Sequence, residues 1–195
     1  MITGIISILC YLQCFGTLSA SVTAKNENGN FVLKNKNVEL VFANGKEFLF
    51  KEFRMDGMNI LPVDGSTTHP WQLIYRGPNG ENPTLMPRWG EYKGGEIQKT
   101  QDASTLIFTW QMVIDAGPTC PVRILVTLGK DAELPEWRIE AEMPEGWVIT
   151  ESEFPRIAVN RPEGAKGILP VGFGTEYTIG NNCNHVILRV QAQCS

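Results

Sequence analysis

The residues best suited to ligand chemistry lie between positions 71 and 92. They are three aromatic side chains, two arginines and one glutamate: Trp71, Arg76, Arg88, Trp89, Glu91 and Tyr92. Sugar rings present apolar C–H faces that stack on aromatic side chains, while charged groups beside them bond the ring hydroxyls. Glycine and proline recur throughout residues 64–95, which predicts a long loop around one strand at 71–76. We therefore expect a carbohydrate-binding surface on this loop.

The same aromatic residues also have a structural interpretation. Trp71 and Tyr75 share strand parity with Leu73, so both side chains could instead belong to the core. Trp89 and Tyr92 stand among glycines, and the sequence leaves a core role and a surface role open for each of them.

Carboxylates that could catalyse a reaction are sparse. Glycoside hydrolysis needs two carboxyl groups roughly 5–10 Å apart across a cleft. The candidates are Glu151 with Glu153, and the loop residues Asp131, Glu133 and Glu136. Both sets are more typical of a solvated rim. Nucleophile motifs, phosphate-binding loops and dinucleotide fingerprints are absent from the sequence, so we do not expect catalysis by this chain alone.

No metal or cofactor site is predicted. Beyond the first 24 residues the chain has Cys120, Cys183 and Cys194, with His69 and His185 as its histidines. Their wide spacing does not match that of zinc ligands, and His69 has no identifiable partner as a general base. An odd number of cysteines in an exported protein leaves one thiol free or bonded to another chain.

Charge and length narrow the class of partner. A length of 195 residues is enough for one domain plus a leader. The formal charge of the chain is −4. Nucleic-acid binders need a basic surface to neutralise phosphates. We therefore expect neither a nucleic-acid partner nor an anionic membrane partner.

The N-terminus has the composition of a secretory signal. Residues 1–24 contain no charged side chain, an apolar run fills 2–18, and small residues follow at 19–24. This predicts a signal peptide at 1–24 and a periplasmic, cell-surface or extracellular protein. A membrane anchor that is not cleaved is the alternative. Because Gly4, Gln13 and Gly16 interrupt a run that barely reaches spanning length, we expect no stable membrane insertion after cleavage.

The elements that would position these residues are strands. Apolar and polar residues alternate in 105–114, 122–128 and 137–143, with turn residues between them, which predicts an antiparallel meander with one dry face. Asn44-Gly45 predicts a hairpin turn before 47–54, for which we favour a bulged strand over a short helix. Short strands at hairpin spacing throughout 25–180 predict an all-β, antiparallel β-sandwich.

Four segments resemble a known group of domains: residues 37–53, 58–62, 151–157 and 169–174. They are similar to the N-terminal β-sandwich domains of exported glycoside hydrolases from gut Bacteroidetes and of related proteins. The resemblance implies the galactose-mutarotase-like supersandwich, a domain that precedes a catalytic barrel and helps to shape its glycan cleft. The catalytic His and Glu pair of true mutarotases matches no position here, so no catalytic residue carries over.

Together these observations predict an exported, non-catalytic module of carbohydrate-processing machinery, the N-terminal domain of a glycoside hydrolase. Its partner would be a missing C-terminal catalytic domain, since residues 181–195 form a tail without strand-and-turn pattern, as a shifted reading frame would produce. Two alternatives stay open. One is a self-standing carbohydrate-binding module whose ligand is a glycan bound by loop 69–92. The other is a small epimerase-like or hydrolase-like enzyme.

Overall fold

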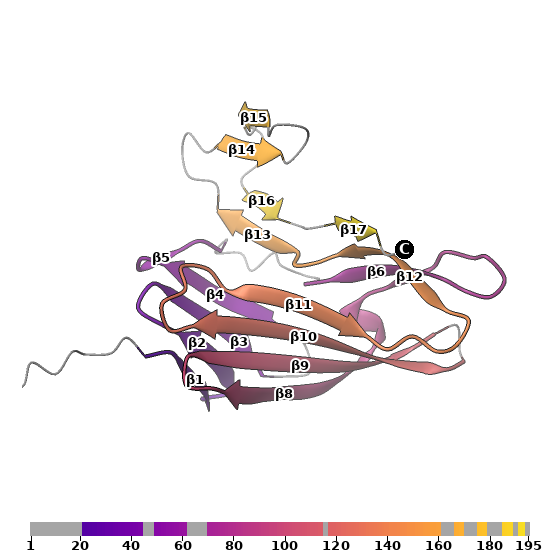
Figure 1. The fold of residues 1–195 in the computed structure, drawn as a ribbon, viewed down its shortest axis with the longest axis horizontal. Coiled ribbons are helices and arrows are strands. Elements are labelled where there is room, and N and C mark those ends of the chain that lie inside the picture. The colour runs from indigo at the N-terminus through magenta and orange to yellow at the C-terminus, as the bar shows by residue number, and fades with distance from the viewer. Residues whose placement is uncertain are drawn as a thin grey trace, which may run out of the picture.

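The computed structural model describes residues 21–44, 49–61, 70–114 and 117–160, and the backbone of four later strands at 166–169, 175–178, 185–188 and 191–193. Antiparallel strands dominate these residues, and their one helical element is the 3-10 turn η1, Pro87–Trp89. The predicted all-β class is confirmed (Figure 1).

The N-terminal sheet contains five strands in chain order. They are β1 Thr23–Glu27, β2 Asn30–Lys34, β3 Val38–Ala43, β4 Leu49–Met55 and β5 Met58–Asn59. The ladder of β3 and β4 shifts register, because Val41 faces Glu52 whereas Phe42 faces Phe50. Lys51 is thus the extra residue of a bulge. The bulge explains how Phe50 and Phe53 are both buried although they have opposite parity, and it confirms the bulged strand over the helix.

The central sheet is the predicted meander with one strand added. Its order is β11-β10-β9-β8, with β8 Glu91–Lys99, β9 Ala103–Val113, β10 Thr119–Gly129 and β11 Glu136–Ala141. Every second residue of β9 and β10 faces inward, and those side chains are almost completely buried: Leu106, Phe108, Trp110, Met112, Cys120, Val122, Ile124, Val126 and Leu128. The period of two therefore predicted the dry face correctly.

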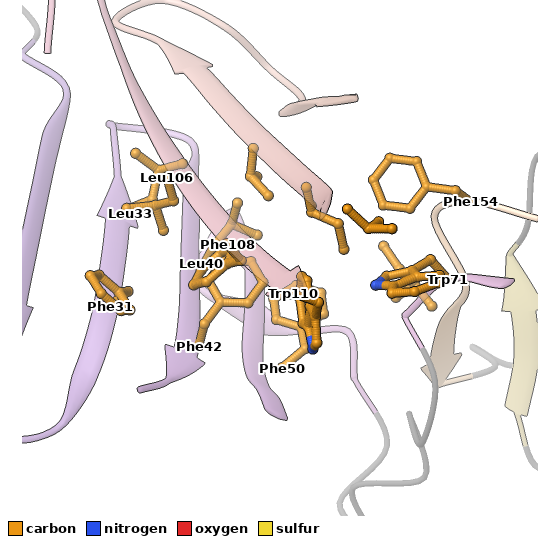
Figure 2. Close-up of a cluster of buried hydrophobic side chains, with 14 of the residues drawn as sticks. Phe31, Leu33, Leu40, Phe42, Phe50, Trp71, Leu106, Phe108, Trp110 and Phe154 are labelled. Carbon is orange, nitrogen blue, oxygen red and sulfur yellow. The ribbon is translucent and has the colours of Figure 1, made fainter. Parts of the chain in front are cut away.

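The two sheets pack through aromatic rings (Figure 2). Phe31 of β2 meets Phe108 of β9 edge to face with centroids 5.5 Å apart, and Phe42 of β3 lies 5.1 Å from the same ring. Phe42 also stacks on Phe50 at 4.6 Å. Such offset and edge-to-face pairs add to the free energy of burial itself.

A third sheet extends this core in the order β17-β12-β6-β7, with β6 Gln72–Arg76, β7 Thr84–Leu85, β12 Val148–Glu153 and β17 Gln191–Gln193. Two separate pairs follow, β13 Ile157–Asn160 with β16 His185–Leu188, and β14 Lys166–Leu169 with β15 Thr175–Thr178. β16 and β17 lie within the segment that we expected to be an irregular tail. The rest of that tail, and residues 1–20 of the expected signal peptide, lie outside the described residues.

Asn35 joins the turn after β2 to the loop after β10. Its buried amide nitrogen donates to the backbone oxygens of Gly129 at 2.9 Å and Ala132 at 2.8 Å. Its side-chain oxygen accepts from the backbone nitrogens of Asn37 at 2.9 Å and Val38 at 2.8 Å. One side chain thus fixes two loops from different sheets.

Candidate functional site

The turn η1 places Trp89 on the surface. Pro87 opens the turn, and the backbone nitrogen of Trp89 donates to the oxygen of Met86 at 3.1 Å. Gly90 then presses against the end of β9, where a β-carbon would overlap Met112 Sδ and lie 3.1 Å from the oxygen of Gln111. Because the backbone approaches so closely, the indole of Trp89 projects outward and is 51% exposed.

Arg88 and Glu91 flank this indole in the chain. The guanidinium of Arg88 lies over the Trp89 ring, 5.0 Å from its centroid, within the range of a cation–π contact. Glu91 begins β8 and pairs with Lys93 at 2.6 Å. The result is an exposed aromatic ring under a cation, with a carboxylate two residues further along the chain. Aromatic, cationic and acidic groups together are the combination that sugar recognition uses. We call Arg88, Trp89 and Glu91 the aromatic turn.

An exposed apolar residue lies at the same end of the central sheet as the aromatic turn. The ladder of β8 and β9 ends where Glu91 faces Gln111, and the turn η1 lies against β9. Val113, two residues beyond Gln111 at this end of β9, is 53% exposed. Sequence reasoning missed Val113, because the pattern of β9 predicted only which side chains face inward.

The other predicted site residues lie elsewhere. Trp71 is completely buried, with its ring 5.8 Å from that of Trp110. The ring of Tyr92 also packs on Trp110, with centroids 5.3 Å apart. Burial raises the pKa of the Tyr92 phenol to about 12. Trp71 is therefore inaccessible to a ligand, and Tyr92 is a half-buried ring packed on the core. Arg76 is exposed at the far end of β6, where its Nε lies 3.4 Å from Asn82 Oδ1.

The predicted long loop is more ordered than its glycines indicate. Glu91 and Tyr92 were expected in a loop but begin β8. Gly94 has a φ of 112° at a bulge in the β8–β9 ladder, and a β-carbon on Gly95 would lie 2.6 Å from the Phe31 ring. These glycines allow a bulge and a close sheet-to-sheet approach within a strand.

The candidate catalytic carboxylates lie in two places: Glu151 and Glu153 on β12, and Asp131, Glu133 and Glu136 between β10 and the start of β11. Glu153 pairs with Arg156 at 3.4 Å, and Asp131 pairs with Lys36 at 3.4 Å. A shallow pocket of about 290 Å³ is lined by Asn37, Met55, Asp56 and Glu133. Asp56 and Glu133 are both exposed there, so a difference in burial does not mark one carboxyl group as a general acid and the other as a general base. Asp56 had no sequence signal, since only the tertiary fold brings the turn after β4 to the loop after β10.

Metal-ligating groups do not gather in the part of the chain that the structure describes: no three His, Cys, Asp or Glu side chains could hold one ion. Cys120 is buried, its Sγ lies 3.6 Å from Met143 Sδ, and desolvation raises the pKa of its thiol to about 11. His69, Cys183 and Cys194 lie outside the described residues.

Comparison with known protein families gives no match to any family model. Within the described ranges no helix is long and apolar enough to cross a bilayer.

Proposed function

We propose that this chain is an exported, non-catalytic β-sandwich module of carbohydrate-processing machinery, the N-terminal domain of a glycoside hydrolase. The observation that carries the proposal is the exposed apolar surface of Trp89 and Val113 at one end of the central sheet. Exposed apolar side chains at one end of a sheet would suit a surface that another domain or a ligand covers. The resemblance in residues 37–53 and 58–62 implies that this other domain is a catalytic barrel.

The aromatic turn gives this module a role at the glycan cleft. If the barrel packs against Val113, Trp89 lies at the same end of the central sheet, where its indole could line the cleft. Arg88 holds one side of the ring, so the indole is ordered before a sugar arrives and less conformational entropy is lost on binding. The isolated chain is then expected to bind glycans weakly or not at all.

A second candidate is a self-standing carbohydrate-binding module. Trp89 is the sole aromatic side chain among the strongly exposed large hydrophobic residues of the described chain. Together with Arg88 and Glu91 it would suffice for a small glycan site on a flat surface.

Affinity electrophoresis of the isolated chain in gels that contain soluble glycans separates the two candidates. The first predicts mobility unchanged by any glycan. The second predicts retardation that Trp89→Ala abolishes without lowering the melting temperature, whereas Met58→Ala, at another exposed hydrophobic residue, leaves it intact. Retardation that both variants keep would contradict both assignments of the aromatic turn.

The first candidate needs a positive test as well. The chain and the barrel domain encoded with it would be produced separately and mixed, and their association measured by calorimetry. Replacing Val113 with Asp places a charge in the proposed contact and should weaken association at least tenfold, while Met58→Asp serves as the matched control. Equal affinity of both variants would place the contact elsewhere.

A further inference from the structure

Strand β1 begins inside the segment that the sequence assigns to the signal peptide. Its first two ladder pairs join Thr23 to Lys34 and Ala24 to Leu33. Ala24 is buried in the core cluster, and Val22, one residue before the strand, packs against that cluster. Removal of residues 1–24 would therefore take away part of the folded sandwich.

The loss would fall on the edge of the N-terminal sheet. β1 pairs with β2 and also contacts β8 and β9 of the central sheet, so it closes one side of the sandwich (Figure 1). Without Thr23 and Ala24, Leu33 would lose its ladder partner in β1 and keep only Leu40 of β3. Leu33 is completely buried in the intact chain, and exposing such a residue costs free energy in proportion to the area uncovered.

The sequence offers a second junction that spares the strand. Signal peptidases accept small side chains one and three positions before the bond that they cleave. Val22 and Ala24 fit this pattern for the bond after residue 24, and Ser19 and Ser21 fit it for the bond after residue 21. Ser21 is exposed, whereas Val22 packs against the core. The Ser21–Val22 bond is thus the last one before the folded domain.

We infer that a signal peptidase hydrolyses the Ser21–Val22 peptide bond and that the mature protein begins at Val22. Water adds across this bond, leaving a carboxylate on Ser21 of the released leader and a new α-amino group on Val22. The inference rests on the proposed export of the chain, and it moves the boundary of the leader from residue 24 to residue 21.

N-terminal sequencing of the exported protein tests the assigned bond. The full chain would be produced with its own leader in a bacterium and recovered from the periplasm and the medium. A product that begins Val-Thr-Ala-Lys is expected, and a product that begins at Lys25 or at any other residue would overturn the inference. If all the protein stays in the cell as an uncleaved precursor, the proposed export itself fails.

Two variants at Ser21 show that this bond is the one recognised. Ser21→Leu places a bulky side chain directly before the bond and should remove at least nine-tenths of the product that begins at Val22. Ser21→Ala keeps the side chain small and should be processed like the parent. Unchanged processing of Ser21→Leu would assign cleavage to another bond.

A pair of trimmed proteins tests the structural reason separately from export. Chains made in the cytosol without a leader would begin, after the initiating Met, at Ser21, Val22 or Lys25. The chains that begin at Ser21 and Val22 should melt at the same temperature, and the chain that begins at Lys25 several degrees lower. Equal melting of all three would show that residues 22–24 do not support the fold.

Discussion

Trp71 and Trp110 meet edge to face, with ring centroids 5.8 Å apart and planes inclined by 77°. Trp71 directly precedes β6 of the third sheet, and Trp110 lies in β9 of the central sheet, so the contact joins the third sheet to the core. Figure 2 shows the indole nitrogen of Trp71 on the side turned toward Trp110. This nitrogen is buried and has no hydrogen-bond partner among the described residues, so Trp71 contributes through the packing of its ring.

Truncation of Trp71 should therefore damage the core. We expect Trp71→Ala to lower the free energy of unfolding by about 3–5 kcal/mol, the usual cost of removing a large buried side chain. Trp89→Ala removes the same atoms from the surface and should cost less than about 1 kcal/mol. Urea unfolding followed by circular dichroism measures both variants, and equal losses would contradict the placement of these two residues.

Asn35 offers a test of the joint between the sheets. Asn35→Ala removes two donated and two accepted hydrogen bonds and takes away the acceptor of the backbone nitrogens of Asn37 and Val38. We expect a loss of about 2–4 kcal/mol. Asn82→Ala, at an exposed residue with one long contact to Arg76, is the control and should unfold like the parent. A small loss for Asn35→Ala would mean that water replaces its bonds.

Tyr92 should make the protein sensitive to alkali. Burial raises the pKa of its phenol from 10.0 to about 12, so between these values the unfolded chain releases the proton while the folded chain keeps it. The stabilisation is complete below pH 10 and is lost as the pH rises toward 12. We expect Tyr92→Phe, which keeps the ring against Trp110, to flatten the decline in melting temperature over this range. A decline identical to that of the parent would contradict this prediction.

The thiol of Cys120 should be protected in the folded protein. It is buried, and its pKa is raised to about 11, so little thiolate forms near pH 8. We expect iodoacetamide to modify Cys120 at least tenfold more slowly in buffer than in denaturant. Mass spectrometry of the peptide that contains residues 119–122 distinguishes this thiol from the other cysteines. Equal rates would show that solvent reaches the thiol in the native state.

Much of the central sheet was predictable because its dry face leaves a direct trace in the sequence. Each inward residue from Leu106 to Met112 is apolar, and its outward neighbours are mostly polar. The aromatic turn was harder to predict. Trp71 and Trp89 are the same residue type within one glycine-containing and proline-containing stretch, and the contact of Trp71 with Trp110 of β9 separates the buried ring from the exposed one.

Features that depend on two distant segments had no sequence signal. The two hydrogen bonds that Asn35 donates to Gly129 and Ala132, and the pocket between Asp56 and Glu133, arise where the turns of one sheet meet a loop of the other. Val113 was missed for a similar reason, since only the pairing of β8 with β9 brings the end of β9 to the turn η1. Hydrophobic periodicity describes a strand and its faces, but it does not say which loops touch.

The central claim is that this sandwich is the N-terminal domain of a glycoside hydrolase. The most direct test is to sequence the genomic DNA beyond codon 195 and to translate it in all three forward frames. We predict that a long reading frame follows, with the alternating strands and helices of a catalytic barrel. A gene that ends there, with unrelated sequence downstream in every frame, would contradict the claim and leave the self-standing carbohydrate-binding module as the function to test.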